Sequence, residues 1–138
     1  MALHYVTVLC GCVRMAARRG GDEEFEHLGR RLGRLDPAVV GHWRADVDEF
    51  LTELAALSQS PRLTHELMLR HLEFAPYLRL LDADPDARRS QLDHLERLLA
   101  LVEAGEASRA SDECEAGVRD LLDRVIRLRA RPPHSTAT

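Results

Sequence analysis

The stretch DVDEFLTELAALSQSPRL, residues 46–63, contains the end of one amphipathic helix and the start of another. Its apolar side chains recur at the spacing of a helix with one buried face. They are Val47, Phe50, Leu51, Leu54 and Leu57. This helix is expected to end at Ser58-Gln59. Ser60 then fits an N-cap and Pro61 the first helical position, where a missing N–H costs no hydrogen bond. The pattern predicts two consecutive helices joined by a short turn.

Similar signals recur along the whole chain and predict helices at about 2–19, 22–35, 37–57, 61–81, 86–104 and 107–130. The first is apolar on most sides and should be central, whereas the second has a narrow apolar stripe and should lie outside. Asp36-Pro37 repeats the cap-plus-proline signal, so the third helix is expected to open there and to include Val40 in its stripe. Pro76 should kink or split the fourth helix. The sequence predicts an all-α antiparallel bundle of six to seven helices.

Composition argues against several classes of protein. The net charge of −4 disfavours a general nucleic-acid binder. No apolar run is long enough to span a membrane. Cys10, Cys12 and Cys114 lack metal-knuckle spacing, which favours reduced thiols in a cytoplasmic protein. The acidic residues are expected to face outward, and Cys114 has no histidine within a helical turn. The chain is therefore predicted not to be an enzyme.

The turn near Ser58 resembles that of the FCD domain, the ligand-sensing C-terminal domain of FadR-type GntR-family transcription regulators. In that family a helix with Asp-x-x-Phe-His-x-x-Leu runs into a Ser-Gly-Asn-Pro-x-Leu turn. The matching residues here are Phe50, Leu54, Ser58, Pro61 and Leu63. The resemblance implies an FCD-like effector-binding and dimerisation domain over residues 1–131, followed by a disordered tail, 132–138.

Two further segments agree with this resemblance, in the same order along the chain. The family's Ala-Ala-x-Arg-x-x-Asp-x-x-Leu junction is matched by Ala16, Ala17, Arg19, Asp22 and Phe25. The segment HLERLLALVEAGE, residues 94–106, reproduces the apolar positions and the glycine of Glu-His-x-x-Ile-Leu-x-Ala-Ile-x-x-Gly-Asp. The resemblance therefore extends over about residues 2–125.

Many FCD domains bind a divalent metal through one Asp and three His. The corresponding positions here are Val47, Leu51, Leu95 and Gly117, and none of them can bind a metal. A register one residue earlier would give Asp46, Phe50, His94 and Ala116, and one residue later a mixed set. Either shift turns the side chains toward the surface. The metal site is therefore expected to have been replaced by apolar residues.

The family's Arg and Glu in the first helix correspond here to Tyr5 and Leu9, which also points to an apolar pocket. We predict a ligand pocket without metal or other cofactor, lined by Tyr5, Leu9, Val47, Leu51, His71, Leu95 and Gly117. It would bind an apolar or amphipathic small-molecule effector. A collapsed core, filled by its own side chains, is the alternative. His71 also fits a hydrogen-bonded histidine at the edge of the core, and His42 with Asp46 fits a solvated pair.

Two functional hypotheses follow. The resemblance implies an effector-sensing domain, and the alternative is a ligand-free dimerisation or protein-interaction module. Homodimerisation is compatible with both. DNA contact is expected only through a winged helix-turn-helix domain, which these 138 residues do not contain. Whether Met1 is a natural start or the boundary of an excised domain stays open, and in neither case should the chain bind operator DNA by itself.

Overall fold

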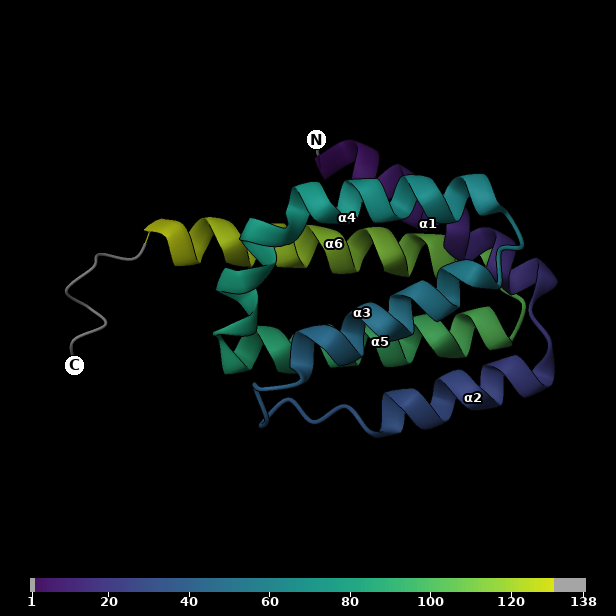
Figure 1. Ribbon diagram of the computed structural model, residues 1–138, viewed down its shortest axis with the longest axis horizontal. Helices are drawn as coiled ribbons and strands as arrows, with labels where there is room; N and C mark the ends of the chain where they lie inside the picture. The colour runs from purple at the N-terminus through teal and green to yellow at the C-terminus, as the bar shows by residue number, and fades with distance from the viewer. Residues whose placement is uncertain (1, 131–138) are drawn as a thin grey trace.

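The structure is a computed structural model that describes the backbone of residues 2–130 and the side chains of residues 5–130. The described residues form six helices: α1 (Ala2–Arg19), α2 (Asp22–Gly33), α3 (Trp43–Ala56), α4 (Pro61–Asp82), α5 (Pro85–Glu103) and α6 (Ala107–Ala130). There is no strand in this part of the chain, so the predicted all-α bundle is confirmed (Figure 1). The predicted tail, 132–138, lies outside the described residues.

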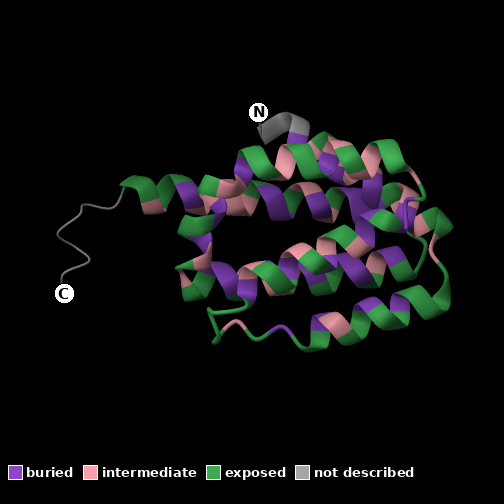
Figure 2. Ribbon diagram, viewed as in Figure 1, coloured by how far each residue is buried: buried purple, intermediate pink, exposed green. Residues whose placement is uncertain are grey.

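α1 packs against four of the other five helices, α3, α4, α5 and α6. Among the described helices, α2 packs against α3 and α5 alone, at the lower edge of the bundle in Figure 1. These positions agree with the apolar surface of each helix, broad in α1 and narrow in α2. Figure 2 shows buried residues on the faces that the helices turn toward one another and exposed residues on their outer faces. The central and peripheral placements predicted from the sequence are confirmed.

The turn between α3 and α4 is fixed by several hydrogen bonds. Ser60 Oγ accepts a hydrogen bond from Leu63 N at 3.3 Å, as expected for an N-cap. Arg19, at the end of α1, donates to the carbonyl oxygen of the fully buried Ser58 at 2.8 Å. Between these serines, Gln59 has a φ of 55°, in the left-handed region. The turn therefore joins α3, α4 and the end of α1.

The third helix begins at Trp43, so the prediction that Asp36-Pro37 opens it was wrong. Asp36 Oδ1 instead accepts from Ala38 N at 2.9 Å and forms a turn. An Asp-Pro pair initiates turns as readily as helices, and the following Val-Val-Gly contains poor helix formers. Val40 is 54% exposed and is not part of the core stripe. The buried Arg88 donates to the carbonyl oxygen of Pro37 at 2.7 Å and thereby holds this segment against α5.

Trp43 opens α3 inside the core. Its side chain is 2% exposed, and it is the only tryptophan of the chain. The indole Nε1 is buried without a hydrogen-bond partner in the described part of the structure. The start of α3 is therefore held by packing, without a hydrogen bond from this ring.

Pro76 lies inside α4, which continues through it as one helix. In Figure 1 the end of α4 leaves the line of its first part and runs toward the start of α5. A proline removes one backbone hydrogen bond and crowds the preceding turn, which accounts for the bend. The predicted kink is thus present, and α4 is not split.

Candidate functional site

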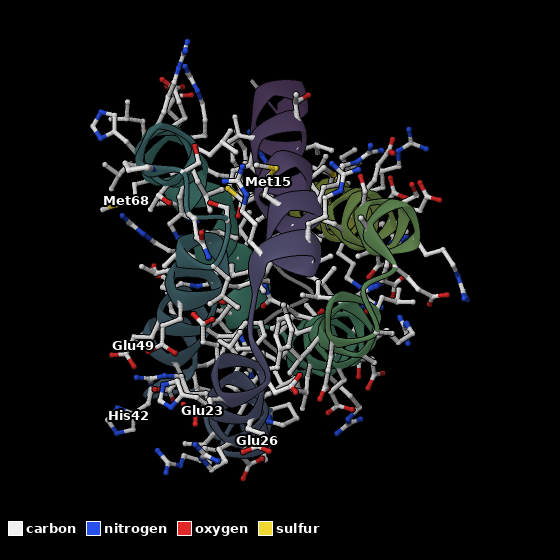
Figure 3. All side chains as sticks on the ribbon, turned by 90° about the vertical axis from the view of Figure 1, so that its right-hand side faces the viewer. Met15, Glu23, Glu26, His42, Glu49 and Met68 are labelled. Atoms are coloured by element: carbon white, nitrogen blue, oxygen red, sulfur yellow. The ribbon has the colours of Figure 1, made fainter. Side chains whose placement is uncertain are left out.

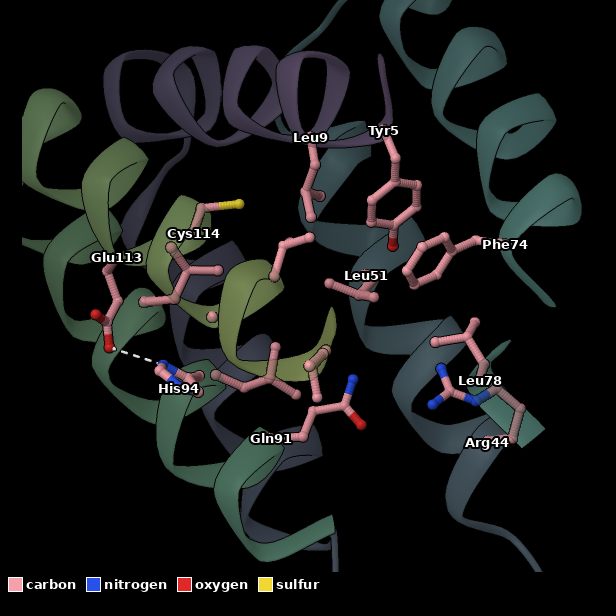
Figure 4. A pocket seen from close by; sticks show the side chains of 15 residues that line it. Tyr5, Leu9, Arg44, Leu51, Phe74, Leu78, Gln91, His94, Glu113 and Cys114 are labelled. Atoms are coloured by element: carbon pink, nitrogen blue, oxygen red, sulfur yellow. Dashed lines mark hydrogen bonds and ion pairs between the residues drawn. The ribbon is translucent and has the colours of Figure 1, made fainter. Parts of the chain in front are cut away.

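A cavity of about 50 Å³ lies in the interior of the bundle (Figure 4). Five of the residues predicted to form a pocket line it: Tyr5, Leu9, Leu51, Leu95 and Gly117. They come from α1, α3, α5 and α6. The other apolar residues of its lining are Phe74, Leu78, Leu98, Val118 and Leu121. The cavity wall is therefore mostly apolar.

The other two predicted pocket residues lie elsewhere. Val47 is fully buried in the core and does not line the 50 Å³ cavity. His71 lines a second cavity, of about 160 Å³, together with Tyr5 and Leu51. A third cavity, of about 240 Å³, lies against α4 and α6 and also contacts Tyr5. Tyr5 is therefore a common wall of three cavities.

His71 is hydrogen-bonded on both ring nitrogens. Nε2 lies 3.0 Å from Asp48 Oδ1, and Nδ1 lies 3.5 Å from the hydroxyl of Tyr5. Burial raises the pKa of Asp48, but the hydrogen bond with His71 and the positive charge of Arg44 outweigh it, so the pKa lies below its ordinary value. Burial raises the pKa of Tyr5 well above its ordinary value, so this phenol stays protonated. These contacts hold the Tyr5 ring between the cavities.

Polar residues that were not predicted to belong to the pocket also line the 50 Å³ cavity. They are Arg44, Gln91, His94, Glu113 and Cys114. Glu113 contradicts the expectation that the acidic residues face outward, because its side chain is 17% exposed and contacts His94 and Arg97. Helical periodicity assigns a residue to a face, but it does not show where a long charged side chain finds its partner.

Gln91 is 7% exposed, and its carboxamide makes no hydrogen bond to any residue that the structure describes. In Figure 4 it extends from α5 into the cavity. A signal for its position existed in the sequence, because Gln91 precedes Leu95 by one helical turn and therefore shares its face. Of that face, only Leu95 was predicted to line the pocket.

The free thiols of Cys10 and Cys114 lie between α1 and α6. They share a hydrogen bond, and Cys10 Sγ also donates to the carbonyl oxygen of Ser111 at 3.5 Å. The hydrogen bond with Cys114 lowers the pKa of Cys10 to about 7. The thiol of Cys114, which borders the cavity, is therefore already partnered.

The residues present do not fit the divalent metal that many FCD domains hold. The positions predicted to correspond to the metal ligands, Val47, Leu51, Leu95 and Gly117, carry three aliphatic side chains and a glycine. Within residues 5–130, no three His, Cys, Asp or Glu side chains are arranged to hold a metal ion. His42 is exposed and points away from the bundle in Figure 3. Separately, no helix in the described part of the chain is long and apolar enough to cross a membrane.

Comparison with known proteins matched residues 5–129 to the FCD domain family. This range includes every residue that lines the interior cavity. The comparisons with curated proteins and with solved structures gave no match.

Proposed function

Because this chain belongs to the FCD domain family, we propose that it senses a small effector in a metal-free interior cavity. FCD domains are effector-sensing domains of GntR-family transcription regulators. In this chain the effector would be apolar or amphipathic. It would be bound through contact with the cavity wall and without coordination to a metal.

One observation carries this proposal. Leu51, Leu95 and Gly117 occupy three of the four positions that correspond to metal ligands in the family, and all three line the same cavity. They come from α3, α5 and α6, so their meeting at one place supports the residue register used for the match. No side chain at these positions offers a lone pair to a metal, and their apolar surface favours an apolar group.

The size of the cavity limits the effector. Sites for drug-sized ligands have volumes of roughly 300–1,000 Å³, whereas the interior cavity measures about 50 Å³. The two neighbouring cavities, of about 160 and 240 Å³, share Tyr5 with it. A small molecule would fit beside Tyr5, whereas a larger one would have to displace the Tyr5 ring and occupy a neighbouring cavity as well.

Native mass spectrometry with metal analysis of the same purified sample tests this proposal. We expect a metal-free protein with a small organic adduct. Leu95→Phe should remove the adduct because it fills the cavity, whereas Val40→Phe, at a position that is 54% exposed, should keep it. Stoichiometric zinc, nickel or manganese would contradict the proposal.

A second candidate function, homodimerisation, is favoured by the outer face of α4. Met68, Leu69 and Leu72 are exposed there within little more than one turn, and Figure 3 shows Met68 on the outside of the bundle. Neighbouring exposed apolar side chains often mark an interface. Light scattering after size-exclusion chromatography should give a dimer for the wild type and a monomer for Leu72→Glu. Leu80→Glu, on the same helix, is the control, and a monomeric wild type would contradict this candidate.

A further inference from the structure

Resting on the proposed function, we propose that the effector is electrically neutral and that Gln91 binds its hydrogen-bonding group. The polar groups around the interior cavity carry this inference, because all but one of them already have partners within the protein. What remains unpaired defines the chemistry of the ligand.

The positive charge of Arg44 is compensated by two carboxylates. Its guanidinium donates to Asp82 through Nε at 2.9 Å and Nη2 at 2.7 Å, and to Asp48 through Nη1 at 3.0 Å. Two carboxylates therefore surround one guanidinium. An anionic ligand would have to compete with both carboxylates, because three of the five N–H donors of Arg44 already point to them.

The acid and the imidazole at the other end of the cavity are also engaged. Glu113 accepts from the guanidinium of Arg97, and its Oε1 lies 3.3 Å from Nδ1 of His94. On its other side, His94 Nε2 lies 3.6 Å from Asp120. A cationic ligand would therefore meet a carboxylate that is already compensated. The hydroxyl of Tyr5 and the thiol of Cys114 have their own partners, His71 and Cys10.

Gln91 is the exception among the described residues that line the cavity. The residue is 7% exposed, its side chain extends into the cavity, and its carboxamide makes no hydrogen bond to a described residue. A carboxamide both donates and accepts hydrogen bonds but carries no charge. A carboxamide that lacks a protein partner beside an apolar wall is free to pair with a complementary neutral group of a ligand. An ion at this place would lose its hydration without gaining an opposite charge.

These observations define the ligand class. The effector has a carboxamide, hydroxyl or similar neutral group directed at Gln91 and a short apolar part against Leu51 and Leu95. One water needs roughly 10–15 Å³ of such space. The cavity of about 50 Å³ therefore suits a group with only a few heavy atoms.

Nuclear magnetic resonance can observe Gln91 directly. The chain contains two glutamines, Gln59 and Gln91, and no asparagine, so only two side-chain carboxamide signals are expected. Gln59 is exposed and serves as the internal control. The probes are propionamide, propionate, which has a similar shape but a negative charge, and xenon, which is apolar. Propionamide should shift the Gln91 signal and leave the Gln59 signal in place, and propionate should shift neither.

Substitutions separate recognition by Gln91 from the existence of the cavity. Gln91→Leu, with Gln91→Met as a second variant, should weaken propionamide binding about tenfold and leave xenon-induced shifts of the Leu95 methyl groups unchanged. Gln59→Leu should keep the affinity for propionamide.

Two results would overturn the inference. Propionate binding as tightly as propionamide would show that the site accepts anions. Xenon binding without any effect of propionamide on Gln91 would show that the cavity accepts apolar ligands but that Gln91 does not select them. If neither propionamide nor xenon entered the cavity, the proposed function would fail together with this inference.

Discussion

A Cβ atom added to Gly117 would lie 3.2 Å from Cγ of His94. The imidazole of His94 thus closely covers α6 at Gly117, the position that the FCD resemblance predicts to match a metal-binding histidine of the family. A larger side chain at residue 117 would require the His94 ring to move, together with its contacts to Glu113 and Arg97. Introducing a metal-binding side chain at residue 117 would therefore disturb a polar cluster at the edge of the cavity.

This contact makes the effect of Gly117→Ala predictable. Glycine inside a helix is normally less stable than alanine by about 1 kcal/mol. At residue 117 we expect this gain to be offset by displacement of His94, leaving the free energy of unfolding within about 0.5 kcal/mol of the wild type. Urea unfolding followed by circular dichroism measures the difference.

Gly29→Ala is the matched control for Gly117→Ala, because a Cβ at this position of α2 meets nothing within 4 Å. It should stabilise the protein by about 0.5–1 kcal/mol. An equal gain for both variants would show that His94 does not crowd residue 117.

Leu95→Asp tests whether residue 95 faces the interior. Leu95 is 6% exposed, so the variant would replace buried apolar surface with a carboxyl group that lacks a dedicated partner. We expect a loss of about 3 kcal/mol or more in the free energy of unfolding. Val40→Asp, at a position that is 54% exposed, should change it by less than about 0.5 kcal/mol. A nearly unchanged free energy of unfolding for Leu95→Asp would mean that the register of the predicted pocket is wrong.

Gln59→Gly should stabilise the turn between α3 and α4. The φ of 55° places Gln59 in the left-handed region, where a Cβ costs about 1 kcal/mol and glycine is unstrained. Gln59→Ala is the control, because it also removes the side-chain hydrogen bond to the carbonyl of Arg19 but keeps the Cβ. Thermal unfolding should give a higher Tm for the glycine variant than for the alanine variant. A higher Tm for the alanine variant would contradict the presence of backbone strain at Gln59.

Asp48→Asn should flatten the acid side of the stability curve. The pKa of Asp48 is lower in the folded protein than its ordinary value, so the unfolded chain binds the proton more readily. Its contribution to stability is present above the ordinary pKa of about 3.9 and is lost as the pH falls through the lower folded value. Urea unfolding at a series of pH values should show a shallower decline for the variant in this range. Equally steep declines for the wild type and for Asp48→Asn would contradict the prediction. Asp93→Asn is the control for the change in net charge.

The sequence predicted the bounds of a helix correctly where its capping residues and its apolar periodicity point to the same segment. The first helix was predicted over 2–19 and the last over 107–130, and both match the structure. Asp36-Pro37 failed as a helix start because the same pair also begins a turn, and the long-range hydrogen bond from Arg88 to Pro37 cannot be read from local pattern. Sequence periodicity thus predicted the helices well, but it did not predict the path of the segment that connects α2 to α3.

The apolar part of the candidate site could be predicted from the sequence, and its polar part could not. The apolar positions Leu9, Leu51 and Leu95 follow from helix faces and from the FCD resemblance, and they line one cavity. Gln91 and Arg44 were missed because their roles depend on which polar groups find partners across helices, and this depends on the tertiary arrangement. A search for polar residues one turn from a predicted pocket leucine would have found Gln91.

The single buried indole at the start of α3 gives this protein an intrinsic optical reporter. Trp43 has no polar partner for Nε1 in the described part of the structure and is nearly inaccessible to solvent, so its fluorescence should be blue-shifted in the native state. Its neighbour in the chain, Arg44, lines the interior cavity. Emission from one chromophore therefore reports both on global unfolding, through a red shift, and on changes beside the cavity, without any attached dye.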